Sequence, residues 1–326
     1  MPKVSVVIPV YNTGAYLDRT LKSMTDQTLQ DIEIICVDDG SSDDSLHVLK
    51  KWERNDARVH VIAFPENRGV CSARNAGLDA ALAPYVYFMD SDDWLDADFL
   101  EAMYSKADET GQDVVVNASL VREYEDANKK PEIENCGFTE PGYYPPAYVQ
   151  SHILSVLVLR LYKRDFILRN GIRFPDLHHG GEDNYFASLA EMLQTRSYVF
   201  FGPYYHYWQR EGSLAHKESR GFSYIQSYRL LYEDLVSRNV PLDGIKLFYS
   251  DIFSIDSREV FDYIKSYLEE AGDSILQHRD LYTVLDNLLF DAVLSNPDYE
   301  SFLAHHHPNL AIDYLRSRIK KQQSHE

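Results

Sequence analysis

Hydrophobic positions over residues 1–120 form short continuous runs and helical stripes, with polar segments between them. Continuous apolar runs bounded by polar turns predict buried strands. The runs are Val4–Val10, Ile32–Val37, Val59–Ala63, Tyr85–Met89 and Val114–Val116. Apolar residues at helical spacing predict helices at Tyr16–Met24, Ser42–Leu49, Val70–Leu82 and Asp96–Asp108. This alternation is typical of an α/β fold, a mostly parallel Rossmann-like sheet with helices on both faces.

The periodicity changes further along the chain. Residues 122–147 lose it and combine many charged residues with Pro, Gly and Tyr, so we expect a mobile loop excursion there. Strand and helix signals resume at Leu154–Tyr162, a helix is expected over Asn184–Leu193, and two closing strands flank Gly202-Pro203.

From about residue 222 onward the pattern predicts helices near residues 222–238, 252–270, 279–293 and 298–318, with almost no strand signal. The sequence therefore predicts one α/β domain over residues 1–220 and a helical C-terminal module over residues 221–326. Apolar stripes such as Leu230-Leu231-Leu235 exceed what a small separate module covers. We expect the module to pack on the α/β domain and to mediate homo-oligomers or docking.

Composition limits the partners. Lys and Arg total 32 and Asp and Glu total 51, which gives a net charge of −19 that disfavours nucleic acid. The three cysteines offer no pairing framework, which fits a reducing compartment. No stretch reaches the roughly 20 apolar residues of a membrane span. We expect a cytoplasmic protein, with peripheral membrane contact through the basic residues Arg316–Lys321 as the minor alternative.

Three polar clusters follow predicted parallel strands. Tyr11-Asn12 follows the first, Asp38–Asp43 the second and Asp90–Asp93 the fourth. Open parallel sheets bind ligands at the carboxyl ends of their strands, so we expect these clusters to build one site.

The strongest cluster is Asp90-Ser91-Asp92-Asp93. Two carboxylates separated by one residue at a strand end point the same way and repel each other unless a cation lies between them. Mg²⁺ or Mn²⁺ suits such oxygen ligands and leaves positions open for a diphosphate. The alternative is a helix N-cap formed by Asp93 or Asp96.

A second acidic pair, Glu182-Asp183, follows two glycines and opens the predicted helix. Carboxylates placed there face a cleft, and one of them can act as a general base. The alternative is that the pair only stabilises the helix dipole. A third polar segment, Tyr207–His216, is a basic loop with Gly212 that can fold over a diphosphate.

Four motifs together resemble the family-two glycosyltransferases, in that family's order and spacing. They are Val4–Asn12, Val37–Asp43, Asn67–Gly77 and Asp90–Asp93, and Glu182-Asp183 extends the match. The resemblance implies a GT-A fold and inverting transfer of a sugar from a nucleotide sugar, in polysaccharide or glycoconjugate synthesis. It places the nucleotide-sugar site in residues 1–120 and the acceptor and base region in residues 121–220.

The resemblance also implies roles for the residues of the donor site. Pro9 and Tyr11 would line the base pocket, with the Tyr11 ring against the base. Asp39 would accept from the ring N–H of uracil, and this favours a UDP-sugar. Asp90 would contact the ribose, next to Ser91.

The remaining implied roles concern charge and proton transfer. Arg74 would support the base pocket and the neighbouring carboxylates, as an ion-pair partner of Asp38 or Asp90. Asp92 would hold Mn²⁺ or Mg²⁺, completed by His216, and Arg210 would contact a phosphate. Asp183 would be the catalytic base, with Glu182 beside it. The acceptor would be a glycan, a lipid-linked or a protein-linked glycoconjugate.

Two other functions compete with this interpretation. A sugar-phosphate nucleotidyltransferase uses a related sheet, but its Gly-rich basic loop after the first strand is absent, and Tyr11–Gly14 stands there. A non-catalytic nucleotide-sugar-binding assembly protein is the second, and the intact acids at positions 39, 90, 92 and 183 disfavour it.

Overall fold

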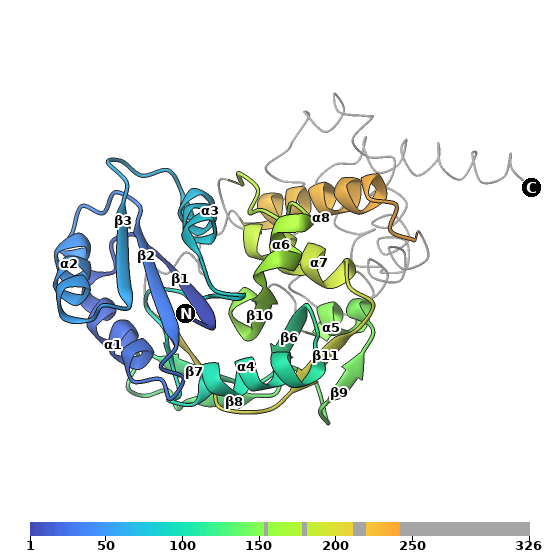
Figure 1. Ribbon diagram of the computed structural model, residues 1–326, viewed down its shortest axis with the longest axis horizontal. Helices are drawn as coiled ribbons and strands as arrows, with labels where there is room; N and C mark the ends of the chain where they lie inside the picture. The colour runs from blue at the N-terminus through green and yellow to red at the C-terminus, as the bar shows by residue number, and fades with distance from the viewer. Residues whose placement is uncertain (153–155, 178–180, 211–219, 242–326) are drawn as a thin grey trace, which may run out of the picture.

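The computed structural model describes residues 1–152, 156–177, 181–210 and 220–241 (Figure 1). Its main sheet contains β1 (Val4–Val10), β2 (Ile32–Asp38), β3 (Val59–Ala63), β4 (Tyr85–Phe88), β6 (Val114–Asn117), β9 (Gly142–Tyr144), β10 (Arg160–Lys163) and β11 (Ser197–Phe200). The strand order is β3-β2-β1-β4-β10-β6-β11-β9. β10 is antiparallel to both of its neighbours and β9 to β11, whereas the other pairs are parallel. The mostly parallel α/β sheet predicted from the sequence is confirmed.

Helices cover both faces of this sheet. The helices over one face are α1 (Gly14–Thr25), α2 (Ser45–Asn55) and α4 (Phe99–Thr110). Those over the other are α3 (Val70–Ala80), α6 (Arg164–Arg169), α7 (Glu182–Met192) and α8 (Arg220–Ser237). Alternate side chains of β1 enter the two cores, since Val6 and Ile8 belong to the first and Val7 to the second. A helix α5 (Pro146–His152) and a short 3-10 helix (Leu157–Leu159) precede β10.

A second sheet of four strands lies beside the first. Its strands are β5 (Trp94–Leu95), β7 (Leu120–Tyr124), β8 (Glu132–Glu134) and β12 (Tyr205–Gln209), in the order β5-β12-β7-β8. The prediction of a loop over residues 122–147 is therefore wrong in part, because most of β7 and all of β8 and β9 lie there. These strands lack the apolar alternation from which a strand is usually predicted. Arg122 on β7 instead forms an ion pair with Glu134 on the neighbouring strand β8.

The carboxyl ends of β1, β2 and β4 meet at one edge, as expected. Val10 lies opposite Asp38, and Val7 lies opposite Phe88. The polar segments that follow these strands are therefore neighbours in space.

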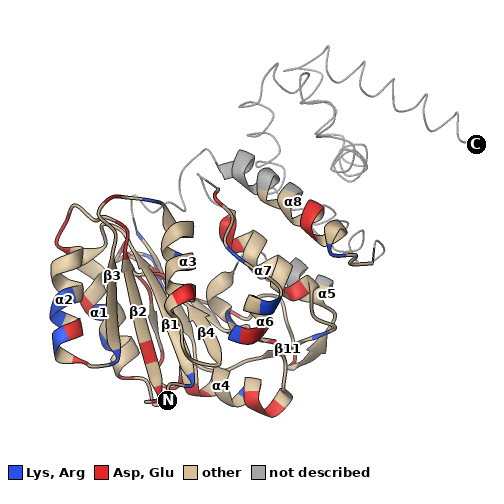
Figure 2. Cartoon of the chain, turned by 45° about the horizontal axis from the view of Figure 1, so that its top comes forward, with Lys and Arg blue, Asp and Glu red and all other residues tan. Residues whose placement is uncertain are grey.

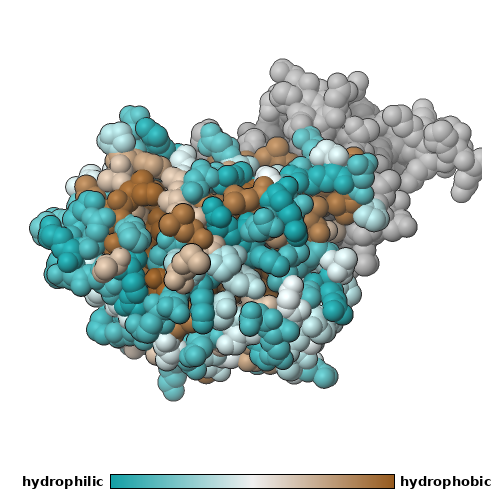
Figure 3. Space-filling view, viewed as in Figure 1, coloured by the Kyte–Doolittle hydropathy of each residue, from teal (hydrophilic) through white to brown (hydrophobic). Residues whose placement is uncertain are grey.

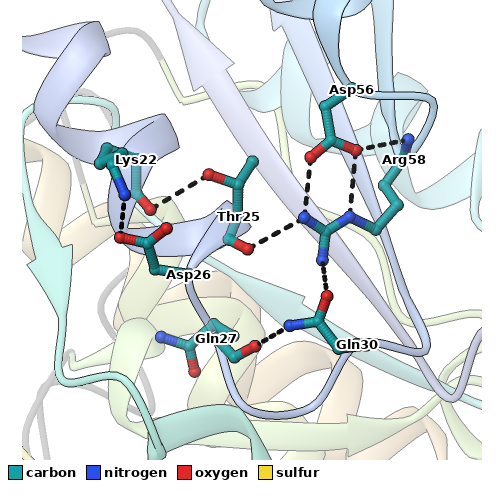
Figure 4. A network of polar contacts seen from close by, with 7 residues as sticks. All are labelled: Lys22, Thr25, Asp26, Gln27, Gln30, Asp56 and Arg58. Carbon is teal, nitrogen blue, oxygen red and sulfur yellow. Dashed lines mark hydrogen bonds and ion pairs between the residues drawn. The ribbon is translucent and has the colours of Figure 1, made fainter.

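The opposite edge is held by a polar network around Arg58 (Figure 4). Its guanidinium pairs with Asp56 at 2.7 Å and donates to the Thr25 carbonyl at 2.9 Å and to Gln30 Oε1 at 3.1 Å. These bonds join the loop after α1 to the loop before β3, far from the polar edge. The network stabilises the sheet without taking part in the site.

The predicted helical module begins as expected. α8 packs on α7, with Leu231 and Leu235 fully buried. The remaining predicted helices, at residues 252–270, 279–293 and 298–318, lie outside the described residues, and the domain boundary at residue 220 stays a prediction.

The surface is mainly polar. Basic and acidic residues follow one another along α2 (Figure 2), and hydrophilic residues cover most of the face drawn in Figure 3, with apolar patches between them. No helix among the described residues has the length and apolar content that crossing a membrane requires.

Candidate active site

The segment after β1 presents Tyr11 to solvent. Asn12, with φ of 52°, turns the chain, and its Oδ1 accepts the backbone N–H of Ser42 at 2.8 Å. Tyr11 is 48% exposed, while Pro9 is buried within β1. The loops after β1 and β2 are therefore joined by a hydrogen bond, and the Tyr11 ring beside them is exposed to solvent.

Asp39 organises the neighbouring loop. Its two carboxylate oxygens accept the backbone N–H groups of Arg68 at 2.7 Å and Gly69 at 2.9 Å. Gly40 permits this approach, because it has φ of 68° and a Cβ there would lie 2.5 Å from the Glu66 carbonyl carbon. Burial raises the pKa of Asp39, and the two N–H donors act against that shift. Each oxygen keeps a further lone pair for a ligand.

The acids after β4 are paired with arginines. Asp90 Oδ1 accepts from Arg74 Nη2 at 3.0 Å, and Asp92 Oδ2 accepts from Arg210 Nε at 2.7 Å. Two guanidinium groups therefore already supply positive charge beside these carboxylates, and the metal ion expected at Asp92 stays a prediction. Burial, followed by the nearby Asp90, raises the pKa of Asp92, and Arg210 opposes that rise.

Ser91 lies inside the turn, not at its surface. It is 6% exposed, and its hydroxyl accepts from Thr13 Oγ1 at 2.9 Å. Thr20 Oγ1 donates to the Ser91 carbonyl at 3.0 Å. Ser91 therefore fixes the turn against α1 and the loop before it.

Asp93 is fully buried and has a structural role. Its carboxylate accepts from the Tyr205 hydroxyl and from the Trp208 backbone N–H, the latter at 2.7 Å. The alternative prediction of a helix N-cap at Asp93 or Asp96 is wrong, since α4 begins at Phe99 directly after Asp98. Asp93 instead ties β12 of the small sheet to the acidic turn.

The second acidic pair opens α7, as predicted, two residues earlier than the expected start of the helix. Gly181, with φ of 84°, turns the chain into it. Glu182 Oε1 accepts from Arg74 Nη1 at 2.8 Å, whereas Asp183 Oδ1 accepts the Asn184 backbone N–H at 2.8 Å. Burial and, next, the charge of Glu182 raise the pKa of Asp183 to about 7.

Arg74 joins the two acidic segments. It is 6% exposed and reaches Asp90 on one side and Glu182 on the other. Of the two partners expected for it, Asp90 is confirmed and Asp38 is not a contact. The Arg74 Nε and Glu182 Oε2 atoms are buried without a hydrogen-bond partner among the described residues. The two acidic segments are therefore held at a fixed distance by one buried cation.

Sequence reasoning missed Arg19, which supports the turn from α1. Its Nη2 donates to the Asp92 carbonyl at 2.8 Å, and its guanidinium lies over the rings of both Trp94 and Trp208. Tyr16, one turn earlier on α1, contacts the Arg210 guanidinium. An aromatic and a basic residue three positions apart in α1 were the available signal, but helical spacing does not tell what they contact.

The residues around Asp92 fit a divalent cation that also binds a diphosphate. In the described part of the chain no group of three or more His, Cys, Asp or Glu side chains is placed to hold a metal ion. A magnesium-type site in nucleotide enzymes needs only one or two carboxylates, because phosphate oxygens and water complete it. Asp92, whose side chain is 17% exposed, would supply such a ligand. The second expected ligand, His216, lies outside the described residues.

Comparison with known proteins decides the family. The model of "Glycosyl transferase family 2" matches residues 5–171, about half of the chain. The chain belongs to this family. The match spans the sheet edge formed by the carboxyl ends of β1, β2 and β4, and the acidic pair at the start of α7 lies just beyond it.

Two relatives illustrate the similarity of this family-2 chain. The poly(ribitol-phosphate) beta-N-acetylglucosaminyltransferase TarP of Staphylococcus aureus is 28% identical over 254 residues, which cover 73% of this chain and 75% of TarP. A mannosyltransferase of Pyrobaculum calidifontis, solved with GDP-Man and Mn²⁺, is 18% identical with a TM-score of 0.53, covering 90% of this chain and 87% of that one. In alignments with two further bacterial relatives, this chain spans only 60% and 31% of the length of those proteins.

The fold agrees with that of a third protein. Staphylococcus aureus TarS, residues 1–349, solved with UDP-GlcNAc, has a TM-score of 0.68 and 22% identity, and the match covers 99% of this chain and 92% of that one. The GT-A fold predicted from the resemblance is thereby confirmed.

Proposed function

We propose that this protein is an inverting glycosyltransferase that moves a sugar from a UDP-sugar to a glycan or glycoconjugate acceptor. The observation that carries the proposal is the Arg74 bridge, which holds a donor-side carboxylate, Asp90, and the acidic pair at α7 around one buried guanidinium. Such a bridge suits a reaction in which a donor bound at one segment meets a base on the other. TarS was solved with UDP-GlcNAc, and TarP is named a poly(ribitol-phosphate) beta-N-acetylglucosaminyltransferase, which supports a uridine donor and a role in polysaccharide synthesis.

The donor site uses the loops after β1, β2 and β4. The exposed Tyr11 ring stacks on the base above Pro9, since aromatic faces pair readily with flat rings. Asp39 accepts N3–H of uracil with a lone pair that its backbone partners leave unused. Asp90 lies at the ribose, and Ser91 acts by holding the turn.

The diphosphate binds between Asp92 and Arg210. Mn²⁺ or Mg²⁺ held by Asp92, with His216 as its second protein ligand, would supply positive charge that stabilises the leaving diphosphate. Arg210 adds a charge-assisted hydrogen bond to a phosphate oxygen.

Asp183 removes the proton from the acceptor hydroxyl. That oxygen attacks the anomeric carbon from the face opposite the nucleotide, the carbon–oxygen bond to UDP breaks, and UDP carries away the electron pair. Single displacement inverts the anomeric carbon. The raised pKa of Asp183 suits a base that accepts a proton near neutral pH.

The remaining parts of the proposal concern location and organisation. The catalytic domain covers residues 1–220, and the helical module over residues 221–326 contributes acceptor docking or a homo-oligomer contact. α8 supports a role near the acceptor, because Ser227 Oγ donates to the Gly181 carbonyl at 2.6 Å, next to the acidic pair. We place the protein in the cytoplasm, with peripheral contact at the inner membrane face as the alternative.

A panel of UDP-sugars tests the proposal. The full chain is incubated with each donor and Mn²⁺, with and without glycan acceptors, and UDP release is measured beside the anomeric configuration of the product by NMR. We expect UDP release from one or a few donors and an inverted product. The matched control is Asp98→Asn, which changes an acid at the start of α4 and should release UDP like the unmodified chain. A retained configuration, or UDP binding without any release across the panel, contradicts the proposal.

A further inference from the structure

Two arginines contact Asp92, and they are held differently. The Arg19 guanidinium lies 3.8 Å from the Trp94 ring centroid and 4.5 Å from that of Trp208, and it donates to the Asp92 backbone carbonyl. Arg210 instead contacts the carboxylate, with its Nε 2.7 Å from Oδ2. Arg19 therefore fixes the backbone of the turn, whereas Arg210 neutralises the side-chain charge.

The Arg210 contact is open to exchange. The side chains of Arg210 and Asp92 are 21% and 17% exposed, so water reaches the pair. The Arg210 guanidinium lies 5.1 Å from the Tyr16 ring centroid, farther than Arg19 lies from either of its rings. Because one side of the pair is open to solvent, a charged ligand can reach both groups and compete for them.

A divalent cation competes with Arg210 for the same carboxylate. A guanidinium 2.7 Å from Oδ2 occupies one coordination position and repels an approaching cation. Asp90 is paired with an arginine as well, because its Oδ1 accepts from the buried Arg74. A cation alone therefore meets a carboxylate whose charge is already neutralised.

A nucleotide diphosphate removes this competition. Guanidinium groups bind phosphate oxygens with strong, charge-assisted hydrogen bonds, and a diphosphate next to Asp92 offers Arg210 such a partner. The same phosphate oxygens complete the coordination of the cation. One movement of Arg210 thus serves both ligands.

We propose that Arg210 determines the order of binding: it occupies Asp92 before the nucleotide arrives and transfers to the diphosphate as the cation takes the carboxylate. The inference rests on the proposed function, since it takes Asp92 as the cation ligand. Arg210 then has two opposite effects on binding. It weakens binding of the cation alone, and it strengthens binding of the cation together with the nucleotide.

Binding of Mn²⁺ alone to the full chain tests the exchange, with free Mn²⁺ followed by electron paramagnetic resonance. Arg210→Ala and Arg210→Gln should each bind Mn²⁺ about tenfold more tightly than the unmodified chain, within the usual range of coupling between sites. Both should bind UDP roughly tenfold more weakly at saturating Mn²⁺, because the phosphate contact is lost. Arg122→Gln is the matched control, since it removes an Arg–Glu pair elsewhere in the small sheet and should change neither affinity.

Unchanged or weaker Mn²⁺ binding in both Arg210 variants overturns the exchange. Asp92→Asn separates this failure from a failure of the proposed function. If Mn²⁺ binding with UDP depends on Asp92 while the Arg210 variants bind Mn²⁺ no more tightly, only the exchange is wrong. If Mn²⁺ binding with UDP is the same in Asp92→Asn, the cation assignment itself is wrong and the exchange falls with it.

Discussion

The turn after β4 and the start of α7 both carry adjacent acids, yet the two regions stabilise them in different ways. In the turn, Asp92 pairs with Arg210 and Asp93 accepts from Tyr205 and Trp208. At α7, Asp183 has a backbone N–H for a partner, and burial raises its pKa to about 7.

The difference distinguishes carboxylates that bind or stabilise from a carboxylate that accepts a proton. A carboxylate with a cationic or hydrogen-bonded partner is fixed in place and suits ligand binding or structure. A buried carboxylate without a cation in direct contact is costly to ionise and readily accepts a proton, as a base requires. Glu182 takes the contact with Arg74, and half-buried Asp183 has no ion pair among the described residues, so it comes closer to this second state.

Changing Asp183 should give the largest effect. Asp183→Asn keeps the size of the side chain but cannot accept the acceptor proton, so kcat should fall by roughly two to four orders of magnitude. Donor affinity should stay nearly unchanged, because the residue lies at α7 and not at the donor edge. Turnover and UDP affinity measured on the same preparation check this. Lost affinity with intact turnover would reassign Asp183 to binding.

Asp93 tests the structural half of the comparison. Asp93→Ala leaves the Tyr205 hydroxyl and the Trp208 N–H buried without an acceptor, so the free energy of unfolding should fall by about 2–4 kcal/mol. Asp98→Ala is the control, because Asp98 precedes α4 without a side-chain capping bond and should cost less than about 1 kcal/mol. Urea denaturation measures both. An equal loss in the free energy of unfolding for both variants would show that the buried hydrogen bonds to Asp93 do not stabilise the fold.

The pH dependence of turnover comes next in size. Only ionised Asp183 accepts a proton, so kcat should fall about tenfold per pH unit below its pKa, near 7, and level off above it. Because the shift is upward, the folded state holds the Asp183 proton between about pH 4 and pH 7 while the unfolded chain has released it. The free energy of unfolding of the unmodified chain should therefore fall relative to Asp183→Asn as pH rises from about 4 to 7, and the difference should level off above pH 7. Glu182→Gln removes a charge that raises this pKa, so the midpoint should move to lower pH. A midpoint that moves upward contradicts the assigned cause.

Asp39 should give the smallest effect, on base selectivity. UDP should bind at least about tenfold more tightly than GDP, a difference of about 1.4 kcal/mol. Tyr11 stacks on any base, so the preference depends on Asp39, and Asp39→Ala should compress the UDP, GDP and CDP affinities towards one another. Competition titrations with Mn²⁺ present throughout measure the three ratios. GDP binding as tight as UDP binding in the unmodified chain would refute the Asp39 assignment.

The sequence predicted the features that depend on local pattern. Continuous apolar runs followed by polar residues located β1, β2 and β4 and their common edge, and a Gly-Gly segment before two acids located the start of α7. The partners of each acid could not be predicted. Arg74 reaches Glu182, 108 positions away, only because α3 and α7 pack on the same face of the sheet.

Residue type alone also failed to distinguish neighbouring acids. Asp92 and Asp93 are adjacent in the sequence, yet Asp92 is partly exposed and Asp93 fully buried. Their difference arises from β12, more than 100 positions later, which brings Tyr205 and Arg210 to the turn. The strands β7 and β8 were not predicted for a related reason. A charged pair between the two strands, Arg122 and Glu134, stands where apolar alternation would be expected.

UDP affinity measured with Mn²⁺ and with excess chelator tests the central claim most directly, that the turn after β4 binds the diphosphate through a cation. Calorimetric titration of the full chain and of Asp92→Asn gives four dissociation constants. The account predicts that UDP binds the unmodified chain at least about tenfold more tightly with Mn²⁺, and that Asp92→Asn loses this difference while remaining folded. Equal UDP affinity in Mn²⁺ and in chelator for the unmodified chain would contradict it.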